Sequence, residues 1–156
     1  MNTLKLFLLV GVLSLGSVAC SDTARTSTAA PDSTEATTEA PDAEAAEESK
    51  EDATGAIRRD QLNSDIRARE ERNNITGGDA DRSDSDLASE VRSKLEANLP
   101  ASALLIEVQD ANVTISGTVP TQEQFDRIEP LAKEIKGVQS VVVKATVAPA
   151  TPDPEG

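Results

Sequence analysis

Residues 21–55 contain no aromatic side chain and no aliphatic side chain larger than alanine. Ten Asp and Glu side chains in this segment outweigh Arg25 and Lys50, which gives it a net charge of −8. Such a segment cannot bury enough apolar surface to offset the conformational entropy that folding removes. The sequence therefore predicts a lipid-anchored, disordered acidic linker over residues 20–55, and the folded core has to come from the rest of the chain.

A short apolar run, residues 6–18, follows Lys5 and ends just before Cys20, the single cysteine of the sequence. Its length fits the hydrophobic region of a secretory signal and is too short to span a bilayer comfortably. The residues that end at Cys20 resemble a bacterial lipobox, although the family pattern prefers Leu where this chain has Ser17. That resemblance implies removal of residues 1–19 as a signal peptide and acylation of Cys20, with palmitate among the acyl chains.

Ordinary signal-peptidase cleavage after Ala19 is the alternative, because Ser17 and Ala19 also fit a small-residue cleavage site. Under the lipobox interpretation, Ser21 stands where a retention signal would place Asp. We therefore expect an exported, periplasmic protein anchored to a membrane through Cys20, and we favour the outer membrane.

The composition excludes several kinds of chemistry. The chain has no His, so catalysis by a histidine general base and Cys/His zinc sites are both ruled out. With one cysteine it forms no intrachain disulfide. Its net charge of −13 argues against nucleic-acid binding. We expect no enzyme activity, no cofactor and no metal site.

Residues 56–78 form a separate, highly charged segment. Most of its residues favour a helix, and Leu62 and Ile66 share a helix face that Ile57 does not join. This apolar stripe is thin, so we expect a solvated, partly formed helix, with a partner-binding or lipid-binding arm as the alternative. Gly77-Gly78 marks the boundary to the next segment.

Residues 79–148 carry the periodicity of a folded domain. Leu87, Val91 and Leu95 recur at helical spacing, which predicts a helix over residues 85–98. Two runs of alternating apolar residues follow, 104–109 and 113–119, with turn chemistry at residues 110–112 between them. They predict a β-hairpin.

A second helix begins at Thr121, and Gln124 completes a capping box. Pro130 interrupts the helix, so we expect a kink or a restart there. Gly137 is expected to end the helix as its C′ residue. Alternating residues from Val138 to Val147 predict a third strand, and residues 149–156 a disordered tail.

The element order is therefore α-β-β-α-β, a small two-layer α+β domain. Two helices would cover one face of a three-stranded mixed sheet, after a long disordered N-terminal arm. The opposite face would carry Thr114, Ser116, Lys144 and Thr146.

The domain resembles a BON domain, a small module of bacterial envelope proteins. The resemblance rests on Asp-x-x-Leu-x-x-x-Val-x-x-x-Leu at 84–95, Val-x-Ile-x-Gly-x-Val at 113–119 and Gly-Val-x-x-Val-x-Val at 137–143. It implies a phospholipid-binding, non-enzymatic role in envelope integrity or stress tolerance. A protein-interaction module that docks an envelope complex, through the sheet edge or the 56–76 helix, is the alternative.

The candidate lipid contacts are cations of the second helix: Arg127, Lys133 and Lys136. Acidic residues alternate with these cations, so an ordinary solvated helix face competes with the lipid-binding interpretation. Gly117 and Gly137 are expected to be structural glycines, at positions where a side chain would strain the backbone. An acidic pattern from Asp79 to Glu90 lacks the glycine that a calcium-binding loop needs, so we predict no metal there.

Overall fold

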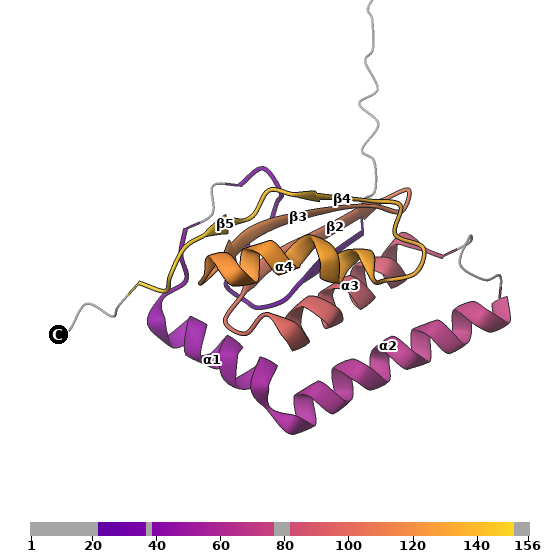
Figure 1. Ribbon diagram of the computed structural model, residues 1–156, viewed down its shortest axis with the longest axis horizontal. Coiled ribbons are helices and arrows are strands. Elements are labelled where there is room, and N and C mark those ends of the chain that lie inside the picture. Colours follow the sequence, from indigo (N-terminus) through magenta and orange to yellow (C-terminus); the bar gives the residue numbers. More distant parts are fainter. Residues whose placement is uncertain (1–21, 37–38, 77–81, 152–156) are drawn as a thin grey trace, which may run out of the picture.

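The computed structural model describes residues 22–36, 39–76 and 82–151. The signal segment, Cys20, Gly77-Gly78 and the last five residues lie outside them. Its elements are β1 (Asp22–Arg25), α1 (Ala43–Thr54), α2 (Ala56–Thr76), α3 (Asp84–Asn98), β2 (Ala103–Gln109), β3 (Asn112–Val119), α4 (Gln122–Lys133), β4 (Ser140–Val143) and β5 (Thr146–Val147). In Figure 1, α3 and α4 lie next to the sheet, and α1 and α2 lie outside α3.

The predicted α-β-β-α-β order and the α+β class are confirmed by α3, β2, β3, α4 and β4. The sheet is mixed: β2 and β3 form an antiparallel hairpin, and β4 runs parallel to β3. The third predicted strand is divided into β4 and β5, and both parts pair with β3.

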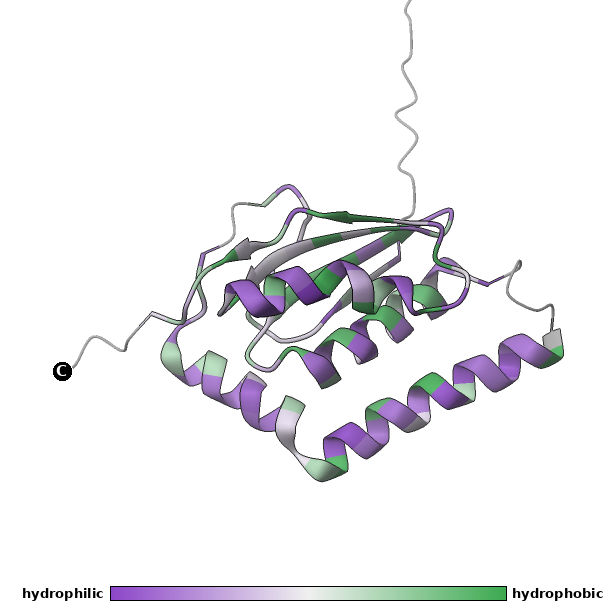
Figure 2. Ribbon diagram, in the orientation of Figure 1, coloured by the Kyte–Doolittle hydropathy of each residue, from purple (hydrophilic) through white to green (hydrophobic). Residues whose placement is uncertain are grey.

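The hydrophobic core lies between the sheet and the two inner helices. Leu87, Val91 and Leu95 of α3 are fully buried, as their spacing predicts, against Ile106 of β2 and Ile115 of β3. Figure 2 shows the contrast in hydropathy: green segments line the sheet and the inner helices, whereas α1 and α2 are mostly purple. Burial of this aliphatic set is the main source of stability, because each large aliphatic side chain contributes about 1.5–3 kcal/mol when buried.

The hairpin turn needs an unusual backbone. Asp110 and Ala111 both have positive φ, 51° and 61°, as a two-residue turn between twisted strands requires. Asp84, at the start of α3, accepts hydrogen bonds from the backbone N–H groups of both turn residues. The first turn of α3 thereby holds a turn that lacks the usual glycine.

Gly117 is required because two strands approach closely. Its φ is 119°, and a Cβ atom built on it would lie 2.0 Å from the Ala103 carbonyl oxygen. Gly117 is paired with Leu104 in the ladder, so neither backbone can move away cheaply. Only a residue without a side chain fits at this position.

Helix α4 passes through Pro130 but ends at Lys133, earlier than the sequence predicts. Its last turn tightens, since Ile135 N–H donates to the Ala132 carbonyl, three residues back. Gly137, with φ of 93°, is therefore not the residue just after the helix. It supplies the positive φ of a tight turn that Val138 N–H closes onto the Ile135 carbonyl.

Within residues 20–55, for which the sequence predicts a disordered linker, the described part of the chain contains strand β1 and helix α1. β1 pairs antiparallel with β2, in register from Asp22–Val108 to Arg25–Leu105. Strand pairing of this kind uses backbone groups and does not need large side chains. Helix α1 begins after Asp42, whose carboxylate accepts a hydrogen bond from Ala45 N–H.

The chain between β1 and α1 returns across the outer face of the sheet, the face away from α3 and α4. Thr34 donates a hydrogen bond to Glu107 on that face at 2.8 Å, and Thr151 N–H donates to the Pro41 carbonyl. Ser116, expected on this face, is buried, while Lys144 and Thr146 are exposed.

Candidate functional site

The cations predicted to contact lipid are all exposed on or just after α4. Arg127 has no hydrogen-bond or ion-pair partner among the described residues. Lys133 forms an ion pair with Glu129 at 2.5 Å. Lys136 follows the helix, and its carbonyl accepts a hydrogen bond from Arg82.

These cations do not form one cluster. Arg127 and Lys133 are six residues apart, so they project about 120° from each other around the helix. Arg127 shares its flank with Glu123, four residues earlier, whereas Lys133 lies toward the opposite flank of the exposed surface and Lys136 follows the end of the helix. The surface of α4 is therefore a mixed-charge face with separated cations.

A second set of charges joins α2 to α3. Arg58 contacts Glu96 at 2.7 Å, and Arg69 contacts Asp86 at 2.7 Å. The two helices run antiparallel, since the start of α2 pairs with the end of α3. Leu62, completely buried between these ion pairs, is the apolar contact of α2. The sequence prediction that Leu62 and Ile57 face different sides is confirmed, because Ile57 is exposed.

Arg82 and Glu90 form an ion pair that is almost completely buried, with side chains 2% and 1% exposed. Burial raises the pKa of the Glu90 carboxyl above its ordinary value, and the Arg82 guanidinium opposes that rise. Arg82 also donates to the carbonyl of Lys136 at 2.8 Å. The pair thereby connects the start of α3 to the chain that follows α4.

A polar cavity of about 420 Å³ lies where the N-terminal segment meets α3. Its lining combines three arginines, three carboxylates and several hydroxyl groups. The charged residues are Arg25, Arg58, Arg92, Glu48, Asp52 and Glu96.

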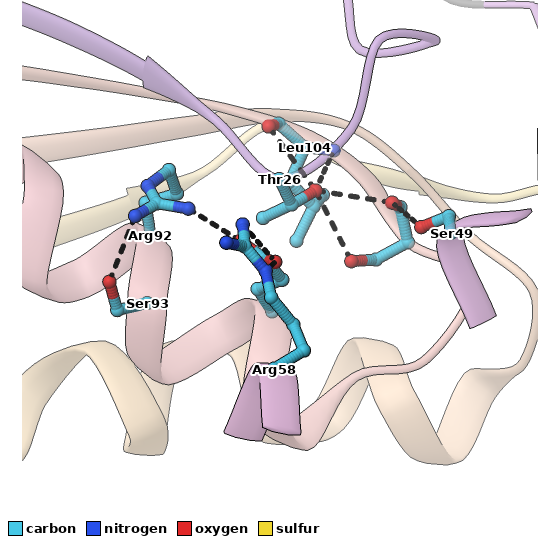
Figure 3. Close-up of polar contacts among 8 residues, drawn as sticks. Thr26, Ser49, Arg58, Arg92, Ser93 and Leu104 are labelled. Atoms are coloured by element: carbon cyan, nitrogen blue, oxygen red, sulfur yellow. Dashed lines mark hydrogen bonds and ion pairs between the residues drawn. The ribbon is translucent and has the colours of Figure 1, made fainter. Parts of the chain in front are cut away.

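The walls of the cavity are held together by hydrogen bonds, which Figure 3 shows. Thr26 and Ser49 both donate to the Ser102 carbonyl, at 3.1 and 3.2 Å. Thr26 also accepts from Leu104 N–H. One carbonyl thus fixes both the end of β1 and helix α1 to the loop before β2.

Glu96 lies between two guanidinium groups at the base of this cavity. Arg58 donates to one carboxylate oxygen at 2.8 Å, and Arg92 donates to the other at 2.5 Å (Figure 3). Arg92 also reaches Ser93. Glu96 is 5% exposed, so these charges interact in a partly desolvated setting.

Sequence reasoning did not find this cavity. Its residues come from β1 and the chain after it, from α1 and α2 and from α3, and a single sequence does not say which arginine meets which carboxylate. The available signal was the group of arginines in residues 56–76, which was interpreted as a solvated surface.

In residues 22–36, 39–76 and 82–151, no group of three or more His, Cys, Asp or Glu side chains could hold a metal ion. None of the helices built from these residues is both long and apolar enough to cross a membrane.

Comparison with known proteins identifies the domain. Residues 83–149 match the family model of the BON domain, and the match begins at Ser83, the N-cap of α3. The predicted resemblance to this domain is therefore confirmed. A stretch of 60 residues is 42% identical to Osmotically-inducible protein Y of Escherichia coli (strain K12). The aligned stretch covers 37% of this chain and 30% of that relative, and no solved structure matches.

Proposed function

We propose that this chain, which carries a BON domain at residues 83–149, is a non-enzymatic, membrane-tethered envelope lipoprotein. Its BON domain binds phospholipid surfaces and supports envelope integrity or tolerance of stress. The similarity to a relative named for osmotic induction supports the stress-related part of this proposal. The absence of histidine from the whole sequence supports a non-catalytic role.

The membrane attachment in this proposal is an acyl anchor at Cys20, most consistent with the outer membrane because Ser21 follows the cysteine. Two acyl signals give stable anchoring, since one chain alone binds reversibly. The anchor would supply most of the membrane affinity, and the domain would add contacts with head groups.

The observation that carries the lipid proposal is the exposed surface of α4. Arg127, Lys133 and Lys136 face solvent there, and no described element covers them. Residues 81–147 have eleven acidic and seven basic side chains, a net charge of −4. The domain therefore binds anionic lipid weakly and only through this local surface, with strong sensitivity to salt.

Vesicle co-sedimentation of residues 21–156, which include every described residue and exclude the apolar signal, tests this proposal. We expect the protein to bind vesicles that contain phosphatidylglycerol and to lose this binding as salt is added. No binding at low salt would contradict the proposal. A triple variant, Arg127→Gln, Lys133→Gln and Lys136→Gln, should lose binding. A control triple, Arg59→Gln, Arg67→Gln and Lys144→Gln, removes the same charge from other exposed sites and should keep most of it.

A protein-docking module is the second candidate function, and the sheet edge favours it. β4 pairs with β3 on one side, and within the described residues its other edge has no partner strand. Val142 on β4 is 50% exposed. An added strand from another envelope protein would pair with this edge. A photo-crosslinker placed at Val142 in cells would trap such a partner, and one placed at exposed Ile57 serves as the control.

A further inference from the structure

The polar cavity between α1, α2 and α3 has a basic side and an acidic side. On the basic side, the guanidinium groups of Arg58 and Arg92 share the single carboxylate of Glu96. Two positive charges against one negative charge leave an excess of one positive charge there. Because Glu96 is buried, water screens this excess less than it would at an open surface.

The acidic side belongs to α1. Glu48 and Asp52 are four residues apart, so they project from the same face of the helix. They line the cavity together with Ala45 and Ser49, which share that face. Neither carboxylate has an ion-pair partner within the part of the chain that the structure describes.

Hydroxyl groups line the space between these two sides. The Ser27 hydroxyl is buried and has no hydrogen-bond partner among the described residues. A buried polar group without a partner is costly, and it is commonly satisfied by water or by a ligand. Thr26 and Ser49 fix the walls through the Ser102 carbonyl, so the cavity keeps its shape without a ligand.

We propose that this cavity binds a small zwitterion. Its oxyanion contacts Arg58 and Arg92, and its ammonium group contacts Glu48 and Asp52. A simple anion would meet the carboxylates of α1, and a simple cation would meet the guanidinium groups, so a molecule with both charges is preferred. A volume of about 420 Å³ suits a molecule of this size.

A free zwitterionic solute and the head group of an ethanolamine phospholipid share this chemistry. The cavity uses none of the α4 cations. The inference is therefore independent of lipid binding by α4, and the two proposals fail separately.

Isothermal titration of the full chain in dodecyl maltoside tests the proposal, with glycerophosphoethanolamine as the probe. Glycerol 3-phosphate carries only the anion and ethanolamine only the cation. Saturable binding of the zwitterion is expected, with each half-probe bound about tenfold more weakly, which corresponds to about 1.4 kcal/mol. Absence of binding, or equal binding of glycerol 3-phosphate, would overturn the proposal.

Two variants assign the two sides. The double variant Glu48→Gln and Asp52→Asn should weaken zwitterion binding about tenfold and leave glycerol 3-phosphate binding equal or stronger. A control pair on exposed positions of α1 outside the cavity, Glu44→Gln and Glu51→Gln, should change neither. An equal loss in both pairs would overturn the assignment.

Arg92→Gln should weaken both the zwitterion and glycerol 3-phosphate, because it removes the oxyanion contact. Circular dichroism of each variant checks that the fold persists.

The same titration in micelles that contain phosphatidylethanolamine identifies the source of the ligand. Competition by the lipid indicates a head-group site, and unchanged binding of the probe indicates a site for a free solute.

Discussion

Asp84 Oδ1 lies 2.9 Å from the backbone nitrogen of Ala111, which joins the first turn of α3 to the tip of the β2–β3 hairpin. The other carboxylate oxygen accepts from Asp110 N–H at 2.8 Å. One side chain therefore sets the position of a helix relative to a hairpin that begins nineteen residues later, at Ala103. It also satisfies two backbone donors in a turn whose φ values are unfavourable for residues other than glycine.

Replacing Asp84 with Ala should lower the free energy of unfolding by about 2 kcal/mol, because two hydrogen bonds to a charged acceptor are lost. Asp84→Asn should cost less, since its amide oxygen still accepts one of them. Urea denaturation measures both. The control variant Glu123→Ala removes an exposed acid from the first turn of α4. If it lowers the free energy of unfolding as much as Asp84→Ala does, the effect of Asp84 comes from the helix dipole and not from its hydrogen bonds.

Replacing Gly117 with Ala should be severely destabilising, by about 3 kcal/mol or more, because the new Cβ would collide with the Ala103 carbonyl oxygen. Thermal denaturation monitored by circular dichroism measures the loss. Gly55→Ala is the matched control, because its nearest contact would be 3.2 Å and its φ is −60°. A small effect at Gly117 would contradict the close approach of β2 and β3.

The Arg82–Glu90 pair makes stability depend on pH. Burial raises the folded-state pKa of Glu90 above 4.5, and Glu70 adds to the rise while Arg82 and Arg69 oppose it. The folded protein therefore binds this proton more readily than the unfolded chain. The contribution of Glu90 to stability is complete below the unfolded pKa and is lost as pH rises through the folded pKa.

The wild-type chain should therefore lose stability relative to Glu90→Gln as pH rises from the ordinary pKa of a Glu carboxyl through the raised folded-state pKa of Glu90. Urea denaturation at a series of pH values measures this difference. The control variant Glu123→Gln, at an exposed position, measures the change in stability that follows the loss of one surface carboxylate. A difference between wild type and Glu90→Gln that grows in the opposite direction would show that the Arg82 guanidinium outweighs burial.

The ion pairs of α2 should control how firmly it is held against α3. In the double variant Arg58→Gln and Arg69→Gln, amide hydrogen exchange across residues 56–76 should accelerate about tenfold, because two partly screened ion pairs are lost. The control Arg59→Gln and Arg67→Gln removes the same charge from exposed positions. High salt should accelerate exchange in the wild type more than in the first variant. Equal exchange in both variants would leave Leu62 as the main contact.

The elements of the BON domain were predictable because apolar periodicity reports packing directly. Leu87, Val91 and Leu95 form the buried stripe of α3 at the spacing the sequence displays. The hairpin was predictable for the same reason. The early end of α4 was not predictable, because the tightening of the helix after Pro130 depends on which carbonyl oxygen each later backbone N–H reaches.

β1, α1 and the docking of α2 against α3 were missed for a different physical reason. β1 is held by backbone pairing with β2, and its side chains show no alternation that would indicate a strand. The docking of α2 depends on which carboxylate each arginine meets. Arg58 and Glu96 are far apart in the sequence, and their charges alone do not show that they pair. The polar cavity depends on both β1 and the docking of α2, so it could not be predicted from the sequence either.

The position of β1 changes how far the domain can lie from a membrane. The pairing of Asp22 with Val108 places the sheet only two residues after Cys20. Two residues extend at most about 7 Å, compared with about 30 Å or more for a flexible linker of the predicted length. With an acyl group at Cys20, as proposed, the start of β1 would lie at the lipid surface. The anchor would then determine which side of the domain faces the bilayer, and the domain would not search the periplasm at a distance.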